Sequence, residues 1–326
     1  MKIITGGAGF IGSAICWRLN ELGYKDILIV DSDVEGTKKN NLAGLHYTDY
    51  MDKITFLKEL TGDTFHKSVE TIYHMGACTS TTEDDMDYLI KNNFEYSKHL
   101  AEWCLKHKVR YIYASSAATY GDGELGFDDD EKLIPKLQPL NKYGLSKQMF
   151  DMWVLEHGYQ NKMVGVKYFN VFGPNENHKG DMRSRVNIAH KQILDTGKMK
   201  LFKSLNADYK DGEQKRDFVY VKDAVEMTLF FDNNGKDKNG IYNIGSGEAN
   251  TWNSLAYSLF KAMGKEPVIE YINMPDNLVN QYQYYSKANL SKIRNAGYVN
   301  SITSFEDSVK DYVQNYLSLN KYLSVE

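Results

Sequence analysis

Short apolar runs alternate with helix-like segments through the first half of the chain. The strand-like runs occupy residues 2–5, 27–30, 71–74 and 111–114. The segment 13–22 carries Ile15, Leu19 and Leu22 at helical spacing, and a further helix is expected around 96–106. Strands that alternate with helices in this way predict a parallel sheet covered on both faces. The pattern therefore predicts the α/β class.

The second half of the chain has a less regular pattern. Beyond Asn170 a long polar stretch covers 204–215, and further strand-like runs follow at 218–221 and 241–244. No internal repeat and no low-complexity segment separates the two halves. This change in pattern indicates a second, smaller domain.

Domain boundaries follow from the same change. We expect a first domain over 1–170 and a mixed α/β domain that makes up most of 171–326. The segment 215–243 is expected to return to the first domain.

A glycine-rich turn follows the first expected strand. Residues 5–12, T-G-G-A-G-F-I-G, contain the spacing G-x-G-x-x-G directly before the first expected helix. Backbone N–H groups at such a helix start can bind a pyrophosphate, and a β-carbon would block its close approach. Gly6, Gly9 and Gly12 are therefore predicted to contact a dinucleotide. The first domain is predicted to be a dinucleotide-binding domain with a Rossmann-type, doubly wound parallel sheet.

Two features after the second expected strand bear on the choice of dinucleotide. Asp31 ends that strand, where a carboxylate can accept hydrogen bonds from the adenosine ribose of NAD. Lys38 and Lys39 follow it and could instead bind the 2′-phosphate of NADP. Both cofactors stay open on these residues alone.

A tyrosine and a lysine have the spacing of an acid/base pair. Tyr143 and Lys147 are four residues apart and would share one face of a helix. Positive charge from the lysine and from an oxidised nicotinamide lowers the pKa of a phenol toward working pH, so Tyr143 could accept an alcohol proton. Ser116 follows the strand-like run 111–114 and is expected to hold the substrate hydroxyl beside Tyr143.

Charge and composition limit the class of partner. With 39 basic and 43 acidic residues and a net charge of −4, the chain shows no electrostatic signature of a nucleic-acid or membrane-surface protein. No apolar stretch reaches the length that spans a bilayer, and the three cysteines have no C-x-x-C spacing. We expect a cytoplasmic protein that acts on a small molecule, with no metal ion.

Five ordered motifs together resemble the extended short-chain dehydrogenase/reductase superfamily. They are T-G-G-A-G-F-I-G, S-S-A-A-T-Y-G, Y-G-L-S-K, Y-F-N-V-F-G-P and R-D-F-V-Y-V-K-D. Dehydratases of this superfamily place an Asp-Glu pair where this chain has Ala117 and Ala118, and alanine cannot move a proton. The motifs therefore favour an epimerase over a dehydratase.

More narrowly, residues 2–299 resemble the ADP-L-glycero-D-manno-heptose 6-epimerases. Three motifs carry this resemblance: H-x-G-A-C-T-S-T-T-E at 74–83, N-N-x-x-Y-S-K at 92–98 and N-x-x-H-K-G-D-M-R-S at 175–184. It implies transient oxidation of C6 of an ADP-linked heptose, with return of the hydride from bound NADP. It also implies a ring-like homo-oligomer of five subunits and a role in lipopolysaccharide core biosynthesis. A UDP-hexose 4-epimerase and an NADPH-dependent nucleotide keto-sugar reductase are the alternatives.

The family resemblance also assigns site residues. Lys179 is expected to be a second acid/base, on the side of the substrate opposite Tyr143. Asn170, at a strand end, and Arg216, whose guanidinium suits a diphosphate, are assigned to substrate from their residue types. Asp181 and Tyr282 are added to substrate by the resemblance. The implied cofactor contacts are Phe10, Ile11, Asp31, Ser32, Lys38, Lys53, Met75, Gly76, Ala77, Cys78, Thr79, Asn92, Lys147, Val171 and Lys179.

Overall fold

Strands from both halves of the chain build the structure, a computed structural model that describes residues 1–32, 36–279 and 282–325. The strands are β1 (Lys2–Thr5), β2 (Ile27–Asp31), β3 (Asp49–Asp52), β4 (Thr71–His74), β5 (Arg110–Ser116), β6 (Val164–Tyr168), β7 (Asn170–Phe172), β8 (Met199–Phe202), β9 (Lys215–Arg216), β10 (Phe218–Tyr220), β11 (Gly240–Ile244), β12 (Asn250–Thr251) and β13 (Ile269–Ile272).

The helices connect these strands. They are α1 (Phe10–Glu21), α2 (Lys53–Thr61), α3 (Met86–Leu89), α4 (Tyr96–His107), α5 (Lys142–Glu156), α6 (Arg185–Thr196), α7 (Val221–Phe230), α8 (Trp252–Ala262), α9 (Asp276–Val279), α10 (Ser291–Asn295) and α11 (Phe305–Asp311). Short 3₁₀ segments are η1 (Gly36–Leu42), η3 (Ala117–Tyr120), η4 (Ile134–Lys136), η5 (Tyr159–Asn161) and η6 (Asn177–Met182), and π-helical turns are η2 (Ile90–Glu95) and η7 (Tyr312–Leu317).

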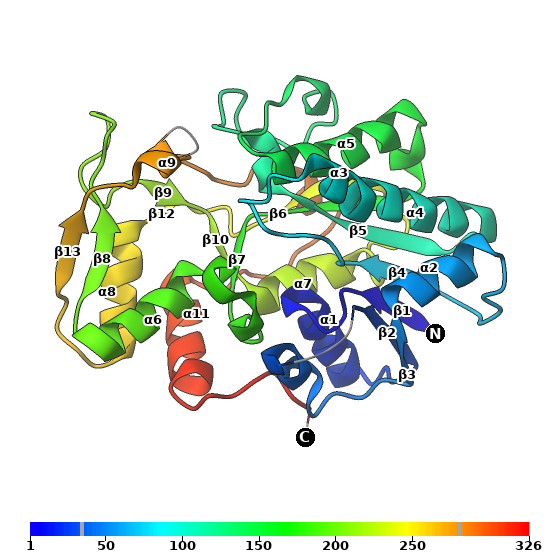
Figure 1. Ribbon diagram of the computed structural model, residues 1–326, viewed down its shortest axis with the longest axis horizontal. Coiled ribbons are helices and arrows are strands. Elements are labelled where there is room, and N and C mark those ends of the chain that lie inside the picture. The colour runs from blue at the N-terminus through cyan, green and yellow to red at the C-terminus, as the bar shows by residue number, and fades with distance from the viewer. Residues whose placement is uncertain (33–35, 280–281, 326) are drawn as a thin grey trace.

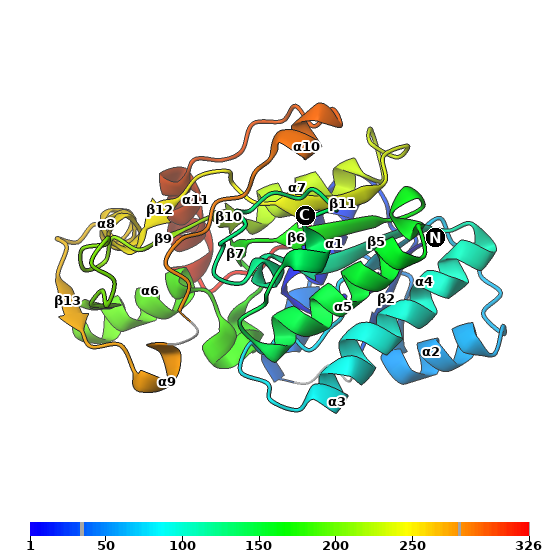
Figure 2. The ribbon, with the colours of Figure 1, turned by 90° about the horizontal axis from the view of Figure 1, so that it is seen from above.

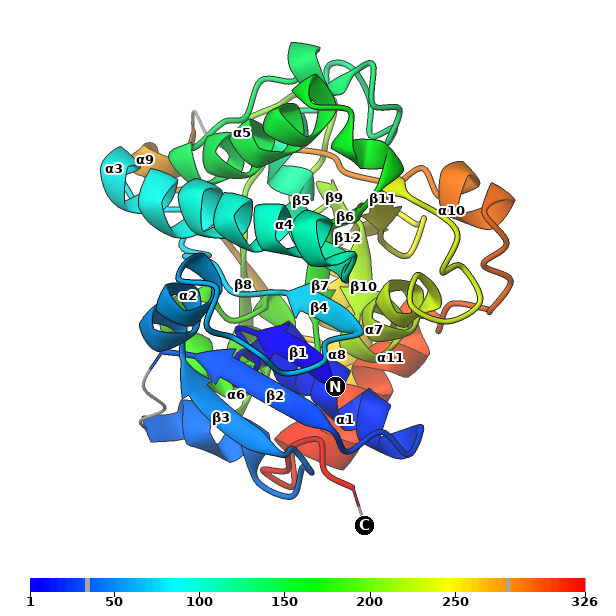
Figure 3. The ribbon, with the colours of Figure 1, turned by 90° about the vertical axis from the view of Figure 1, so that its right-hand side faces the viewer.

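The main sheet has the strand order β11-β6-β5-β4-β1-β2-β3, and every pairing in it is parallel. Figure 3, which looks roughly along the strands of the main sheet, shows helices on both of its faces. The expected Rossmann-type, doubly wound parallel sheet is thus confirmed. The strand order reverses between β1 and β4, which is where ligands bind in such sheets.

Each face of the sheet has its own hydrophobic core. Successive strand residues point to opposite faces, so Ile3 joins the core under α2, α4 and α5, while Ile4 joins the core under α1 and α7. Helices α2, α4 and α5 lie side by side over one face (Figure 2). These two cores hold the carboxyl ends of the strands in fixed positions.

A smaller part lies beyond the carboxyl ends of the main sheet, on the left of Figure 1. There β8 pairs with β13 in a separate two-stranded sheet, and α6 and α8 pack against each other. Strand β11 belongs to the main sheet, so the chain returns there after leaving it at β7. Within the described part of the chain, no helix combines the length and the apolar character needed to cross a membrane.

Candidate active site

The glycine-rich turn forms a tight cradle between β1 and α1. Gly6 has φ +63°, and a β-carbon on it would lie 2.7 Å from the Cα of Gly76. A β-carbon on Gly12 would lie 2.2 Å from the Gly6 carbonyl oxygen. Only glycine allows this packing, which leaves the start of α1 open to a ligand.

The cradle is one wall of a cavity of about 460 Å³. Most of the predicted cofactor contacts line it: Gly6, Gly9, Phe10, Ile11, Gly12, Asp31, Ser32, Lys38, Lys53, Met75, Gly76, Ala77, Cys78, Thr79, Asn92 and Lys179. Lys147 and Val171 lie outside its lining. Backbone N–H groups at a helix start, next to a long cavity with cationic side chains, suit the two phosphates of a dinucleotide. The residues present therefore fit a nicotinamide dinucleotide.

Several lining residues were not predicted from the sequence: Thr5, Val30, Ser80, Tyr88, Tyr96, His178 and Met182. His178 directly precedes Lys179 in the motif at 175–184, so its neighbour was the available signal. Its Nδ1 lies 3.0 Å from Nδ2 of Asn41, and burial together with the charges of Lys38 and Lys179 lowers its pKa to about 4. His178 is therefore neutral at pH 7.

Asp31 already has partners at the end of β2. Its carboxylate accepts hydrogen bonds from the backbone N–H of Ala8 at 3.0 Å and of Ser32 at 2.8 Å. It also forms an ion pair with Lys38. Asp31 and Lys38, which favour different cofactors, are thus in contact with each other, and both residues line the cavity.

The predicted catalytic residues come from β5 and α5. Asn141 caps α5 by accepting a hydrogen bond from the N–H of Gly144 at 2.8 Å. A β-carbon on Gly144 would lie 2.8 Å from the carbonyl oxygen of Ala118, so glycine lets the helix approach the turn after β5 closely. This approach brings Tyr143, on α5, to Ser116, at the end of β5.

The environment of Tyr143 and Lys147 sets their proton affinity. Burial raises the pKa of Tyr143, and a hydrogen bond with Ser116 acts against this rise. Lys147 donates to the carbonyl oxygen of Ala114 at 3.0 Å, and burial lowers its pKa to about 8. Lys147 therefore still carries its proton at pH 7. The arrangement can remove a proton from an alcohol held by Ser116.

Asn93 is a positioning residue that the sequence analysis missed. Its side chain accepts from the backbone N–H of Cys78 at 2.8 Å and donates to the carbonyl oxygen of the same residue at 3.0 Å. It also donates to Oγ of Ser146 on α5 at 3.0 Å. Asn93 thus ties the loop after β4, which lines the cavity, to the helix that carries Tyr143.

Lys179 reaches the same cavity from η6, on the loop between β7 and α6. Its ammonium lies 5.5 Å from the centre of the Phe10 ring. Burial lowers the pKa of Lys179, and the nearby carboxylate of Glu176 opposes that shift. Glu176 is fully buried and holds the loop by accepting from the hydroxyl groups of Ser184 and Tyr312 at 2.6 and 3.0 Å.

The predicted substrate residues lie outside the cavity lining. Asn170 and Asp181 are exposed. Arg216 is only 7% exposed, and its guanidinium lies 5.8 Å from the ring of Trp252 and 5.2 Å from the ring of Tyr282. The indole N–H of Trp252 donates to the Tyr282 hydroxyl at 2.9 Å. Arg216 and Tyr282 thus share one aromatic cluster in the smaller part.

Comparison with known proteins places this geometry in a family. Residues 2–245 match the model of the NAD dependent epimerase/dehydratase family. The chain is 48% identical to an ADP-L-glycero-D-manno-heptose-6-epimerase of Nitratidesulfovibrio vulgaris over 318 residues, which cover 98% of each chain. It is 47% identical to the enzyme of that name from Fusobacterium nucleatum over 327 residues, again covering 98% of each chain.

A solved structure agrees with these sequence matches. The crystal structure of Helicobacter pylori ADP-L-glycero-D-manno-heptose-6-epimerase superimposes with a TM-score of 0.77 and 26% identity, covering 96% of this chain and 95% of the other. The family that the sequence motifs predict is thereby confirmed. The chain belongs to the NAD dependent epimerase/dehydratase family and, within it, to the ADP-L-glycero-D-manno-heptose-6-epimerases.

Proposed function

We propose that this protein converts ADP-D-glycero-D-manno-heptose into ADP-L-glycero-D-manno-heptose by transient oxidation at C6. One observation carries the proposal: Ser116, Tyr143 and Lys147 meet at the carboxyl end of β5, in a chain close to 48% identical to enzymes of that name. An alcohol oxidation needs a group that removes the hydroxyl proton, and this is the arrangement that supplies one.

Each of the three residues has a separate task. Ser116 holds the C6 hydroxyl, Tyr143 takes its proton, and Lys147 stabilises the phenolate by its charge. A bound nicotinamide ring supplies the hydride acceptor for the oxidation and the donor for the reduction. Gly6, together with the rest of the glycine-rich turn, would hold its diphosphate.

Inversion requires the C6 ketone to present its other face. Rotation about the exocyclic C5–C6 bond achieves this while the ADP group stays bound. The oxygen then points away from Tyr143, so a second proton donor is needed on the other side. Lys179 supports this role because it lines the cavity beside the glycine-rich turn and burial lowers its pKa.

We propose NADP as the bound cofactor. Lys38 lines the cavity, and Asp31, which could otherwise bind the ribose of NAD, is in an ion pair with it. Denaturing the purified protein and identifying the released dinucleotide by mass tests this proposal. NAD as the released species would contradict it.

The enzymatic proposal is tested by incubating the purified protein with ADP-D-glycero-D-manno-heptose and following C6 inversion by proton NMR. Inversion without net change in nicotinamide absorbance is expected, since the hydride is returned. Conversion of a UDP-hexose but not of the heptose would favour a 4-epimerase. Net loss of NADPH absorbance when a nucleotide keto-sugar is supplied instead would favour a keto-sugar reductase.

The family resemblance also leads us to propose a homo-oligomer of five subunits in the cytoplasm. Sedimentation equilibrium of the purified protein measures the number of subunits, and a monomer would contradict the proposal.

A further inference from the structure

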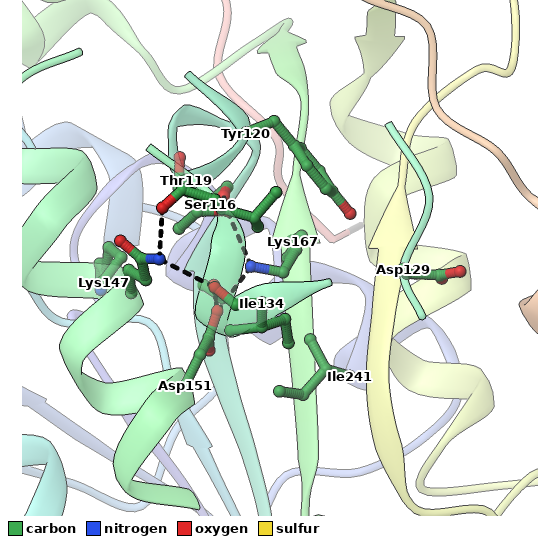
Figure 4. Close-up of polar contacts among 12 residues, drawn as sticks. Ser116, Thr119, Tyr120, Asp129, Ile134, Lys147, Asp151, Lys167 and Ile241 are labelled. Carbon is green, nitrogen blue, oxygen red and sulfur yellow. Dashed lines mark hydrogen bonds and ion pairs between the residues drawn. The ribbon is translucent and has the colours of Figure 1, made fainter. Parts of the chain in front are cut away.

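An ion pair without any solvent exposure lies directly behind the proposed catalytic residues. Asp151 on α5 and Lys167 on β6 are both 0% exposed, and their carboxylate oxygen and ammonium nitrogen are 2.6 Å apart. Figure 4 shows the two side chains pointing toward each other between helix and strand. Removing two charges from water is costly, so such a pair calls for an explanation.

The pair is well supplied with hydrogen bonds. Asp151 also accepts from the hydroxyl groups of Ser115 at 2.7 Å and Tyr113 at 3.1 Å, both on β5. A β-carbon on Gly165 would lie 2.5 Å from the Tyr113 hydroxyl oxygen, so a glycine on β6 makes room for it. Three donors therefore hold the carboxylate in position.

Contacts from this pair reach both sides of the proposed catalytic site. Asp151 lies one helical turn after Lys147 and opposes the effect of burial on its pKa. Lys167 donates to Oγ1 of Thr119 at 2.7 Å, and that hydroxyl donates to the carbonyl oxygen of Ser116 at 2.8 Å. Figure 4 shows Lys167 between Asp151 and the turn that carries Ser116.

Few other groups act on the charge of Lys147. Asp151 on α5 raises the pKa of Lys147, and Cys78 in the loop after β4 has a smaller effect in the same direction. His74 on β4 is buried, and burial lowers its pKa to about 3, so it is neutral. Burial lowers the pKa of Lys147, and the carboxylate of Asp151 opposes this lowering most strongly.

We propose that Asp151 and Lys167 are positioning residues for the proton transfer: Asp151 keeps Lys147 protonated, and Lys167, through Thr119, fixes the turn that presents Ser116. The proposal rests on the assignment of Tyr143 and Lys147 made above. Lys167 balances the charge of Asp151, so the group keeps one net positive charge, on Lys147.

Two charge-neutral double variants of the full-length protein with its bound cofactor test the proposal. Asp151→Asn/Lys167→Gln keeps hydrogen-bonding groups, and Asp151→Leu/Lys167→Met replaces the pair by apolar side chains, which buried ion pairs often tolerate. Both are expected to move the inflection that Lys147 gives to the pH profile of kcat/KM toward acid by about half a pH unit or more, because Asp151 raises the pKa of Lys147 whereas Lys167 is not among the groups that act on it. Asp151→Glu keeps the anion and should restore the wild-type inflection.

The pair of Lys2 and Asp232 offers a matched control. It is also buried, and Asp232 accepts from the hydroxyl groups of Thr71 and Tyr73 on β4, each at 2.6 Å, as Asp151 accepts from those of Ser115 and Tyr113. Asp232→Asn/Lys2→Gln should lower the melting temperature as the first double variant does, but it should leave the inflection in place. A purely structural role would make the two pairs behave alike.

Thr119→Val tests the second half of the proposal without changing any charge. It is expected to lower kcat by roughly 10-fold and to leave the inflection where it is, because only the link to Ser116 is lost. An unchanged kcat would show that Lys167 does not position Ser116.

The outcomes separate this proposal from the proposed function. Absence of heptose turnover in the wild-type protein contradicts the function, whereas a normal wild-type profile that neither double variant moves overturns the role of Asp151. Failure of both double variants to fold, while the Lys2 and Asp232 control folds, also overturns it, since the pair would then be structural.

Discussion

The proposed proton transfer depends on a single atom, the hydroxyl oxygen of Tyr143. Tyr143→Phe removes the proton acceptor but keeps the ring, so cofactor content and melting temperature should stay near the wild-type values. Turnover should fall by about 10²–10⁴-fold, the usual contribution of a positioned acid/base. Steady-state kinetics by NMR, with the bound cofactor quantified after denaturation, measures both.

Tyr111→Phe is the control for this prediction. Tyr111 lies on the same strand as Ser116, is buried, and donates only to the backbone carbonyl of Ser97, at 3.1 Å. This variant should keep most of its activity. Near-normal turnover in Tyr143→Phe would show that Tyr143 is not the proton acceptor.

Lys179 allows a prediction about the two faces of the substrate. If Lys179 serves one face and Tyr143 the other, Lys179→Met should lower epimerisation by roughly 10²-fold. One epimer should still give a single-turnover change in nicotinamide absorbance, while the other gives none. Rapid mixing with each epimer separately measures this asymmetry.

Lys53→Met is the matched control, since Lys53 lines the same cavity and donates to Oδ1 of Asn92 at 3.0 Å. Its loss should weaken cofactor binding and affect both epimers equally. An equal effect on both epimers in Lys179→Met would contradict the assignment of that lysine to one face.

Some residues of the site could be predicted from local sequence motifs, and others could not. Tyr143, Lys147 and the glycines belong to short motifs, because their chemistry requires a fixed local spacing. The partners of Asn93, and the donors that surround Asp151 on β5 and β6, come from other elements, so no local pattern marks these two residues. Lys167 carried a weaker signal: it is the one charged residue in the apolar strand Val164–Tyr168, which indicates a buried partner.

At the scale of elements, the glycine-rich turn is the most constrained piece of backbone. In Gly12→Ala the new β-carbon would meet the Gly6 carbonyl oxygen, so the turn must shift. The loss of stability is expected to be about 1–3 kcal/mol. Cofactor affinity should fall more than 10-fold, since about 1.4 kcal/mol of lost binding is sufficient. Thermal melts and dinucleotide titration measure the two effects.

Gly9→Ala gives a graded comparison. Its β-carbon would lie 3.0 Å from the same Gly6 oxygen, so a shift of a few tenths of an ångström is sufficient. It should lose less stability and less affinity than Gly12→Ala. Wild-type cofactor content in Gly12→Ala would show that the turn tolerates the displacement.

The elements themselves were predicted where periodicity is strong. The strands at 2–5 and 71–74 agree with β1 and β4, and the helix around 96–106 agrees with α4. Strand β3 was missed because its residues are half-buried or exposed and carry little apolar signal. The pairing of β11 with β6 depends on a contact between distant segments, which periodicity does not record. The extents of the two domains stay a prediction.

For the whole molecule, the main question is how one substrate spans two parts of the structure. Ser116 and Tyr143 lie at the main sheet, whereas Arg216 lies in the aromatic cluster of the smaller part. A nucleotide sugar has its reactive carbon at one end and its diphosphate beyond the sugar. We therefore expect the sugar at Tyr143 and the diphosphate toward Arg216.

Arg216 is buried beside two aromatic rings rather than beside a carboxylate of the described residues. Its neighbour Asp217 is occupied by the backbone N–H groups of Ser246, Gly247 and Ala288, at 2.6, 2.9 and 2.9 Å. Among the described residues no carboxylate pairs with the Arg216 guanidinium, which donates to the carbonyl oxygen of Lys215 at 2.8 Å. Burial lowers the pKa of Arg216 to about 10, so it stays charged at pH 7. A buried cation without an anionic partner favours an anionic ligand.

Arg216→Gln should therefore weaken substrate binding far more than it slows the chemical step. KM is expected to rise roughly 10- to 100-fold, because a charge-assisted hydrogen bond to the substrate is lost. The change in kcat should be much smaller. Arg110→Gln is the control, because Arg110 donates to the Phe231 carbonyl oxygen at 3.1 Å, away from the cavity, and should affect only the melting temperature. An unchanged KM in Arg216→Gln, with a lowered melting temperature, would instead make Arg216 structural and leave the diphosphate to other residues.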